Sequence, residues 1–213
     1  TVVGAATVPR MLPTVIYTGG FMTPELNLPN KYRGPVVADL AGMFFEDSVP
    51  MHRDHDTNKP VGHTTRVSDD GRQLSAEGLF SIASDDTTAI VSGRKEGFPW
   101  RPSVGLKLYD YEIIPEGKTV HVNGRDFTGP FLLVHYSELK EIGIVSVPGD
   151  AEVDPIQLAA KAASKAGSSL MKKTFAQWAK ENGFDLATLK KPSKAVLKAH
   201  YDSLKAADGD DKP

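Results

Sequence analysis

Residues 104–113, VGLKLYDYEI, form the longest strand candidate in the chain. Pro102 favours extended backbone just before this segment, and Gly105 allows another chain to approach it closely. Shorter strand candidates surround it at Thr14–Tyr17, Val36–Leu40, Gly62–Val67, Gly78–Ile82 and Ile142–Val147. Most of them are bounded by Gly, Pro or Asp, a pattern typical of a barrel or of a strongly twisted sheet. The sequence therefore predicts a mainly β fold within the α+β class.

The segments between these strands carry turn and helix signals. SDDGRQ, residues 68–73, predicts a turn between two strands. Asp85 or Asp86, followed by TTAIVSGRKEG, predicts an N-capped helix that ends near Gly97 and leads the chain to Ser103. The segment Gly117–Gly129 mixes strand and turn residues and predicts a hairpin.

Composition narrows the function classes. The chain has 213 residues, of which 40% are hydrophobic, enough for one substantial core. It has no Cys, which excludes disulfides, thiolate nucleophiles and cysteine-based zinc sites, and a reducing cytoplasm is the simplest compartment to expect. No stretch approaches the roughly 20 apolar residues of a membrane span, so we expect no membrane association.

The C-terminal part differs in charge from the rest of the chain. After Asp154 there are 11 Lys, no Arg and 6 acidic residues, a net charge of +5, which leaves −7 for the preceding part. We expect a β domain over residues 1–153 and a lysine-rich helical extension over residues 154–213, with a disordered end. The helical segments expected there are Ile156–Ala166, Ser168–Asn182 and Ser193–Ala207.

Three residues at strand edges could together perform nucleophilic acyl transfer. They are His55 in MHRDHD, Ser103 in RPSVGLK and Glu141 in ELKEIGIVSVP. A serine hydroxyl needs a base to take its proton, and the base works best when a third group fixes its tautomer. His55, Ser103 and Glu141 are therefore the candidate base, nucleophile and orienting group.

Each of these residues also has a simpler interpretation. HRDHDTNKPVGH could be a polar surface loop, Ser103 could merely begin a strand, and Glu141 could be a charge at a strand edge. A metal site could use His52 and His55 with Asp54 or His63, because imidazole and carboxylate groups suit Zn or Mn. The segment lacks the helical i, i+4 spacing of H-E-x-x-H, which argues against this alternative.

The order of motifs between Val36 and Asp150 resembles that of the prohead proteases of tailed bacteriophages, which are related to the herpesvirus assemblins. VVADLAGMFFEDSVPMHRDHDTNKPVGHTTRV, residues 36–67, matches the family's apolar strand, its His-Asp pair at 55–56 and its Gly-containing strand. DGRQLSAEGLFSIAS, the helix and PSVGL match the next landmarks, and LKEIGIVSVPGDAEVD matches the last. Gly143 stands where a serine is usual, and Glu141 takes the place of a histidine in assemblins.

The resemblance implies a small herpesvirus-protease-like β-barrel with flanking helices, followed by the C-terminal extension. It implies a serine endopeptidase of capsid maturation with His55, Ser103 and Glu141 as its catalytic residues and no cofactor or metal. Its substrates would be scaffold segments and delta segments of the major capsid protein, and it could cleave itself. It would act inside the assembling prohead in the cytoplasm of the bacterial host, and the resemblance to assemblins allows a homodimer.

A second function class remains open at this point. The chain could be a non-catalytic, scaffold-like assembly protein that keeps the protease fold and acts through its extension. The extension could also be a propeptide, and we do not expect DNA binding because its lysines have no interleaved arginines.

Overall fold

The computed structural model describes residues 8–24 and 32–159 of the chain. The elements follow one another as β1 (Arg10–Tyr17), β2 (Val36–Ala38), a 3₁₀ turn η2 (Leu40–Gly42), β3 (Met43–Phe44), β4 (Pro50–Arg53), β5 (Pro60–Asp69), β6 (Leu74–Leu79), α1 (Asp85–Lys95), β7 (Arg101–Ile114), β8 (Thr119–Val122), β9 (Arg125–Thr128) and β10 (Phe131–Val145). The protein is mainly β, as the sequence predicts.

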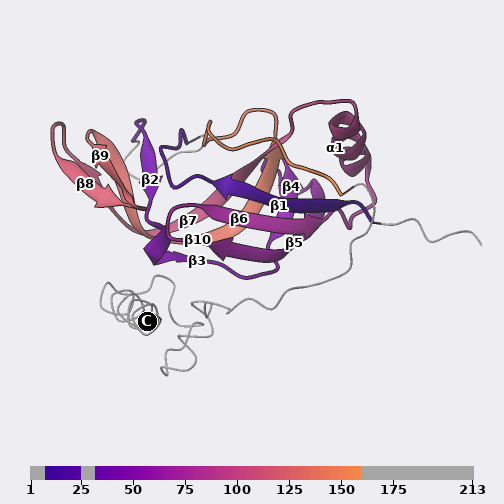
Figure 1. The fold of residues 1–213 in the computed structure, drawn as a ribbon, viewed down its shortest axis with the longest axis horizontal. Helices are drawn as coiled ribbons and strands as arrows, with labels where there is room; N and C mark the ends of the chain where they lie inside the picture. The colour runs from indigo at the N-terminus through magenta and orange to yellow at the C-terminus, as the bar shows by residue number, and fades with distance from the viewer. Residues whose placement is uncertain (1–7, 25–31, 160–213) are drawn as a thin grey trace, which may run out of the picture.

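The 15-residue strand β10 organises the main sheet. Along one edge it pairs antiparallel with β7, and along the other it pairs parallel with β2, β3 and β4 in succession. From β4 the sheet continues through β5 and β6 to β1 in antiparallel pairs. Cα atoms of β1 and β7 come within 8 Å of each other, so the sheet curls into a half-barrel (Figure 1).

The core lies inside this curl. Ile142 and Ile144 of β10 and Met51 of β4 are fully buried there. Because side chains alternate along a strand, Glu141 and Gly143 lie on the outer face of the sheet. A second apolar cluster forms at the other end of β10, where Phe127 of β9 packs near Phe131. The outer face is thus apolar under the β8–β9 hairpin and polar near the end of β10.

Several predicted elements are confirmed, with shifted boundaries. The hairpin of 117–129 is β8–β9, with Asn123 and Gly124 both at positive φ, as tight hairpin turns require. The predicted helix is α1, although its N-cap is Ser84, whose Oγ accepts a hydrogen bond from Thr87 N. Leu40 lies in the 3₁₀ turn, and the strand expected at Gly78–Ile82 lies at Leu74–Leu79.

The segment after β10 crosses between β7 and β1. Ile156 N donates to Trp100 O (2.9 Å), Leu12 N donates to Gln157 O (2.8 Å), and Ala159 N donates to Arg10 O (2.9 Å). Ile156 is fully buried, and Leu158 forms a β-bridge with Met11. Residues 156–159 are therefore extended, and the helix expected from Ile156 does not begin there. The remainder of the predicted helical extension lies outside the described residues.

Within residues 8–24 and 32–159, no helix has the length and apolar character that spanning a membrane requires.

Candidate functional site

Three neighbouring strands bring the candidate residues together on the outer face of the sheet. In the register of these strands Ser103 of β7 lies opposite Gly143 of β10, and Gly143 lies beside His52 of β4. Residues paired in this way point to the same face, with Cβ atoms of neighbouring strands about 5 Å apart. Ser103, Gly143 and His52 thus form one row across the sheet.

Because Gly143 has no side chain, the His55 ring can lie directly above it. A Cβ built on Gly143 would lie 2.6–2.8 Å from Cε1, Nε2 and Nδ1 of the His55 ring. Such contacts are too close for real atoms, so the imidazole occupies the space above Gly143. His55 therefore lies over β10, beside Ser103 in the same row. A glycine at position 143 has a physical reason, since any side chain there would displace this ring.

A tight turn after β4 carries His55 to that position. Asp54 and His55 both have positive φ, 52° and 58°, and Asp56 N donates to Arg53 O (3.0 Å) across them. Two positive φ values in succession are typical of a type I′ turn and are uncommon for residues other than Gly. Asp54 N also donates to Ile144 O (3.2 Å), which ties the turn to β10 next to Gly143.

Glu141 reaches His55 from two residues before Gly143. Its Oε1 lies 2.5 Å from Nδ1 of His55, and its side chain is only 13% exposed. Opposite Glu141 lies Gly105, where a Cβ would collide with the carboxylate. The close approach expected at Gly105 is thus made by the Glu141 side chain.

This arrangement fixes the tautomer of His55. An ionised carboxylate only accepts hydrogen bonds, so Nδ1 of His55 must carry the proton that it shares with Glu141. Nε2 is then the nitrogen able to accept a proton, and Ser103 is the neighbouring hydroxyl in the row. Ser103 is 7% exposed, which places its hydroxyl in a largely water-excluded position. The chemistry that these groups can perform is removal of a proton from Ser103.

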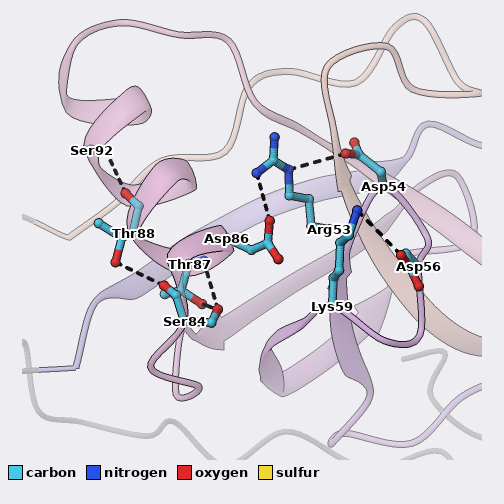
Figure 2. A network of polar contacts seen from close by, with 9 residues as sticks. All are labelled: Arg53, Asp54, Asp56, Lys59, Ser84, Asp86, Thr87, Thr88 and Ser92. Carbon is cyan, nitrogen blue, oxygen red and sulfur yellow. Dashed lines mark hydrogen bonds and ion pairs between the residues drawn. The ribbon is translucent and has the colours of Figure 1, made fainter.

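Polar contacts anchor the turn to α1 (Figure 2). Arg53 Nη1 lies 2.8 Å from Asp86 Oδ1 in the first turn of α1, and Arg53 Nε lies 3.3 Å from Asp54 Oδ2. The same guanidinium lies 5.3 Å from the ring centroid of Trp100. Arg53 therefore connects the His55 turn to the helix and to the residues that precede Ser103.

Asp56, the second member of the His-Asp pair, stabilises the turn. Its Oδ1 accepts hydrogen bonds from Asn58 N (2.9 Å) and Asn58 Nδ2 (3.1 Å). The bond from the Asn58 backbone N–H is the main cause that lowers the pKa of Asp56 below its ordinary value. Its role here is local turn structure.

Gly149 directs a backbone N–H at the candidate nucleophile. Its N atom lies 3.5 Å from Ser103 Oγ, while its carbonyl oxygen accepts from Thr23 N (2.8 Å). The next residue, Asp150, is 3% exposed and accepts hydrogen bonds from Thr18 N and Oγ1. These contacts hold the Gly149 loop against Ser103. No motif in the sequence pointed to Gly149.

A cationic side chain could also stabilise an oxyanion, and Arg94, Arg101 and Arg125 are the arginines to compare with Gly149. Arg94 Nε donates to Ile156 O (2.5 Å), and Arg125 Nη2 donates to Thr18 O (2.7 Å). Arg101 lies on β7 two residues before Ser103. The contact with Ser103 comes from the Gly149 backbone.

His52, which the sequence suggested as a possible metal ligand, contacts Glu141 of the site. Its Nδ1 lies 3.4 Å from Oε2 of Glu141. The other residues considered as metal ligands have different partners. His63 Nδ1 lies 2.8 Å from Ser81 Oγ, and Asp54 pairs with Arg53. Among the described residues, no group of three or more His, Cys, Asp or Glu side chains could hold a metal ion.

No family model matches the chain, and no curated protein matches it.

Proposed function

We propose that this protein is a serine endopeptidase of the prohead protease type, with Ser103 as nucleophile, His55 as general base and Glu141 as the group that orients His55. One observation supports the proposal most strongly. The His55 ring lies above Gly143, in the same row as Ser103, and Nδ1 of His55 contacts the Glu141 carboxylate. The curled, mainly β sheet is compatible with the herpesvirus-protease-like barrel of that family.

The chemistry follows from the order of these groups. His55 Nε2 takes the hydroxyl proton as Ser103 Oγ attacks a peptide carbonyl, and the protonated imidazole then gives that proton to the leaving amine. Glu141 stabilises the imidazolium and keeps the proton of neutral His55 on Nδ1, which leaves Nε2 as the basic nitrogen. The Gly149 N–H stabilises the negative charge on the carbonyl oxygen, as one donor of an oxyanion hole.

The edge of β7 favours a peptide as the substrate. Among the described residues, β7 pairs as a strand with β10 only, and at the start of its other edge Trp100 O accepts a hydrogen bond from Ile156 N. An extended peptide can add to such an edge through main-chain hydrogen bonds. Scaffold segments and delta segments of a capsid protein are the substrates that the family resemblance suggests, and self-cleavage is part of the same proposal.

A fluorophosphonate probe tests the proposal without a known substrate. An activated serine forms an Oγ–P bond with the probe and expels fluoride, so mass spectrometry should locate the adduct on Ser103. Ser103→Ala and His55→Ala should abolish labelling and any self-cleavage, because the general base contributes about 10² to 10⁴ fold and the triad acts as a unit. Glu141→Ala should lower both rates less than these substitutions.

The matched control is Ser92→Ala on the exposed side of α1, where labelling should remain at the wild-type rate. Processing of a co-expressed capsid protein that continues in Ser103→Ala would refute the serine mechanism. Activity lost only on adding a chelator would favour the metal alternative. A wild-type chain that neither reacts nor cleaves would favour the non-catalytic assembly protein.

A further inference from the structure

Glu141 has an imidazole at each of its carboxylate oxygens. Oε1 lies 2.5 Å from Nδ1 of His55, and Oε2 lies 3.4 Å from Nδ1 of His52. His52 is 8% exposed as a residue, and its side chain is 10% exposed. A second imidazole so deeply placed against the orienting carboxylate requires an explanation that the triad alone does not supply.

The strand register separates the roles of the two histidines. His52 lies on β4, beside Gly143 of β10, and Ser103 lies on β7 at the far side of Gly143. Neighbouring strands are about 4.8 Å apart, so β4 and β7 are about 10 Å apart in this row. The His55 ring fills the space between them above Gly143. His52 can therefore influence Ser103 only through Glu141 and His55.

The Glu141 side chain needs support because of where it lies. It extends across Gly105, which has no side chain to pack against it, and a free Glu side chain has several rotatable bonds. Since a carboxylate only accepts hydrogen bonds, Nδ1 of His52 must present its proton to Oε2. A donor at Oε2 limits rotation of the carboxylate and keeps Oε1 on His55.

We propose that His52 is a positioning residue for the reaction, holding Glu141 in the orientation that fixes the His55 tautomer. This inference rests on the proposed function for its effect on rate, but the contact that it invokes can be measured separately. Partners of this kind, which orient a group in direct contact with the chemistry, typically change activity by about 10 to 100 fold when removed at metal sites. We expect a loss of similar size here.

The first measurement follows the hydrolysis of a peptide substrate by two His52 variants. His52→Leu removes the donor and should lower kcat by about 10 to 100 fold with little change in KM, because His52 is buried and lies two strands away from Ser103. His52→Asn keeps a donor near the Nδ1 position and should recover most of the loss. His63→Leu on the neighbouring β5 is the matched control and should keep the wild-type kcat. Equal kcat in wild type and His52→Leu would overturn the proposal.

The second measurement does not depend on hydrolysis. The proton that His55 Nδ1 shares with Glu141 should give a far-downfield proton NMR resonance, which Glu141→Ala abolishes. His52→Leu should broaden or shift this resonance, and His52→Asn should largely preserve it. An unchanged resonance in a folded His52→Leu variant overturns the positioning role. If the wild type shows this His52-dependent resonance but no Ser103-dependent reaction, only the proposed function fails.

Discussion

At the residue scale, Gly143 lies where the side chains of Ser103, His52 and His55 converge, and it adds none of its own. Two glycines leave space for two different groups: Gly105 for the Glu141 carboxylate and Gly143 for the His55 imidazole. Both fall at positions of a strand where a glycine is otherwise unfavourable. Their presence in paired strands reflects close approach by a neighbouring group.

Gly143→Ala should lower both the reactivity of Ser103 and the stability of the protein, and the two losses can be measured separately. The added Cβ would force the His55 ring away, and displacement of a catalytic group by about 1 Å can lower the rate about 10² fold. Stability should fall by about 1 to 3 kcal/mol, the usual cost of added volume in a packed site. Fluorophosphonate labelling and urea unfolding measure the two effects.

The His55→Ala background provides the control for this variant. If the collision with His55 causes the loss of stability, adding Gly143→Ala to His55→Ala should cost little more. An equal loss in both backgrounds would place the strain elsewhere.

At the element scale, the turn between β4 and β5 depends on its contact with α1. Arg53 and Asp86 are about 30% and 28% exposed as side chains, so their ion pair is partly screened by solvent. Arg53→Ala should lower the free energy of unfolding by about 1 kcal/mol and lower kcat several fold, because the turn holding His55 loses one of its supports. Chemical unfolding and steady-state kinetics measure these changes.

Asp86→Asn gives the comparison for that prediction. The two substitutions should be non-additive, since each removes the same ion pair. Fully additive effects would mean that the contact in Figure 2 does not support the turn.

Local elements were predictable from the sequence because their signals are local. The Asn123-Gly124 turn and the helix of α1 have recognisable residues at fixed spacing, and only the cap moved, from Asp85 or Asp86 to Ser84. The strand β4 was missed because four residues give too short a pattern. Residues 131–141 of β10 were missed because the β-bulges near Tyr136 interrupt the alternation of this strand.

The candidate site was predictable only in part for a different reason. His55, Ser103 and Glu141 could be named as a set, yet the parallel pairing of β4 with β10 joins segments that are far apart in sequence. That pairing brings His52 to Glu141 and shows why Gly143 is small. Gly149 likewise approaches Ser103 through a loop conformation that has no sequence signature.

At the scale of the whole molecule, the domain depends on the segment that follows β10. A chain ending at Asp154 would lose the burial of Ile156 and its backbone bond to Trp100, whereas a chain ending at Ala159 keeps both. We expect the shorter chain to be less stable by roughly 2 to 5 kcal/mol, the range for removing a buried aliphatic side chain. Thermal unfolding of the two chains measures the difference.

Comparable stability of the two chains would show that the segment crossing from β7 to β1 contributes little. The sequence predicts that the β domain ends at residue 153. A large loss of stability in the shorter chain would show that the folded domain extends beyond that residue. Both chains omit residues 160–213, so the difference in stability between them reports on residues 155–159 alone.

The position of β10 also has a consequence for synthesis on the ribosome. β2, β3, β4 and β7 all pair with β10, which is the last strand of the main sheet to be made. Until residues 131–145 have left the exit tunnel, those four strands lack their shared partner, and His55 and Ser103 have no Gly143 between them. From the synthesis of Ser103 until β10 emerges, a nascent chain would therefore carry both residues without the geometry that could make them reactive.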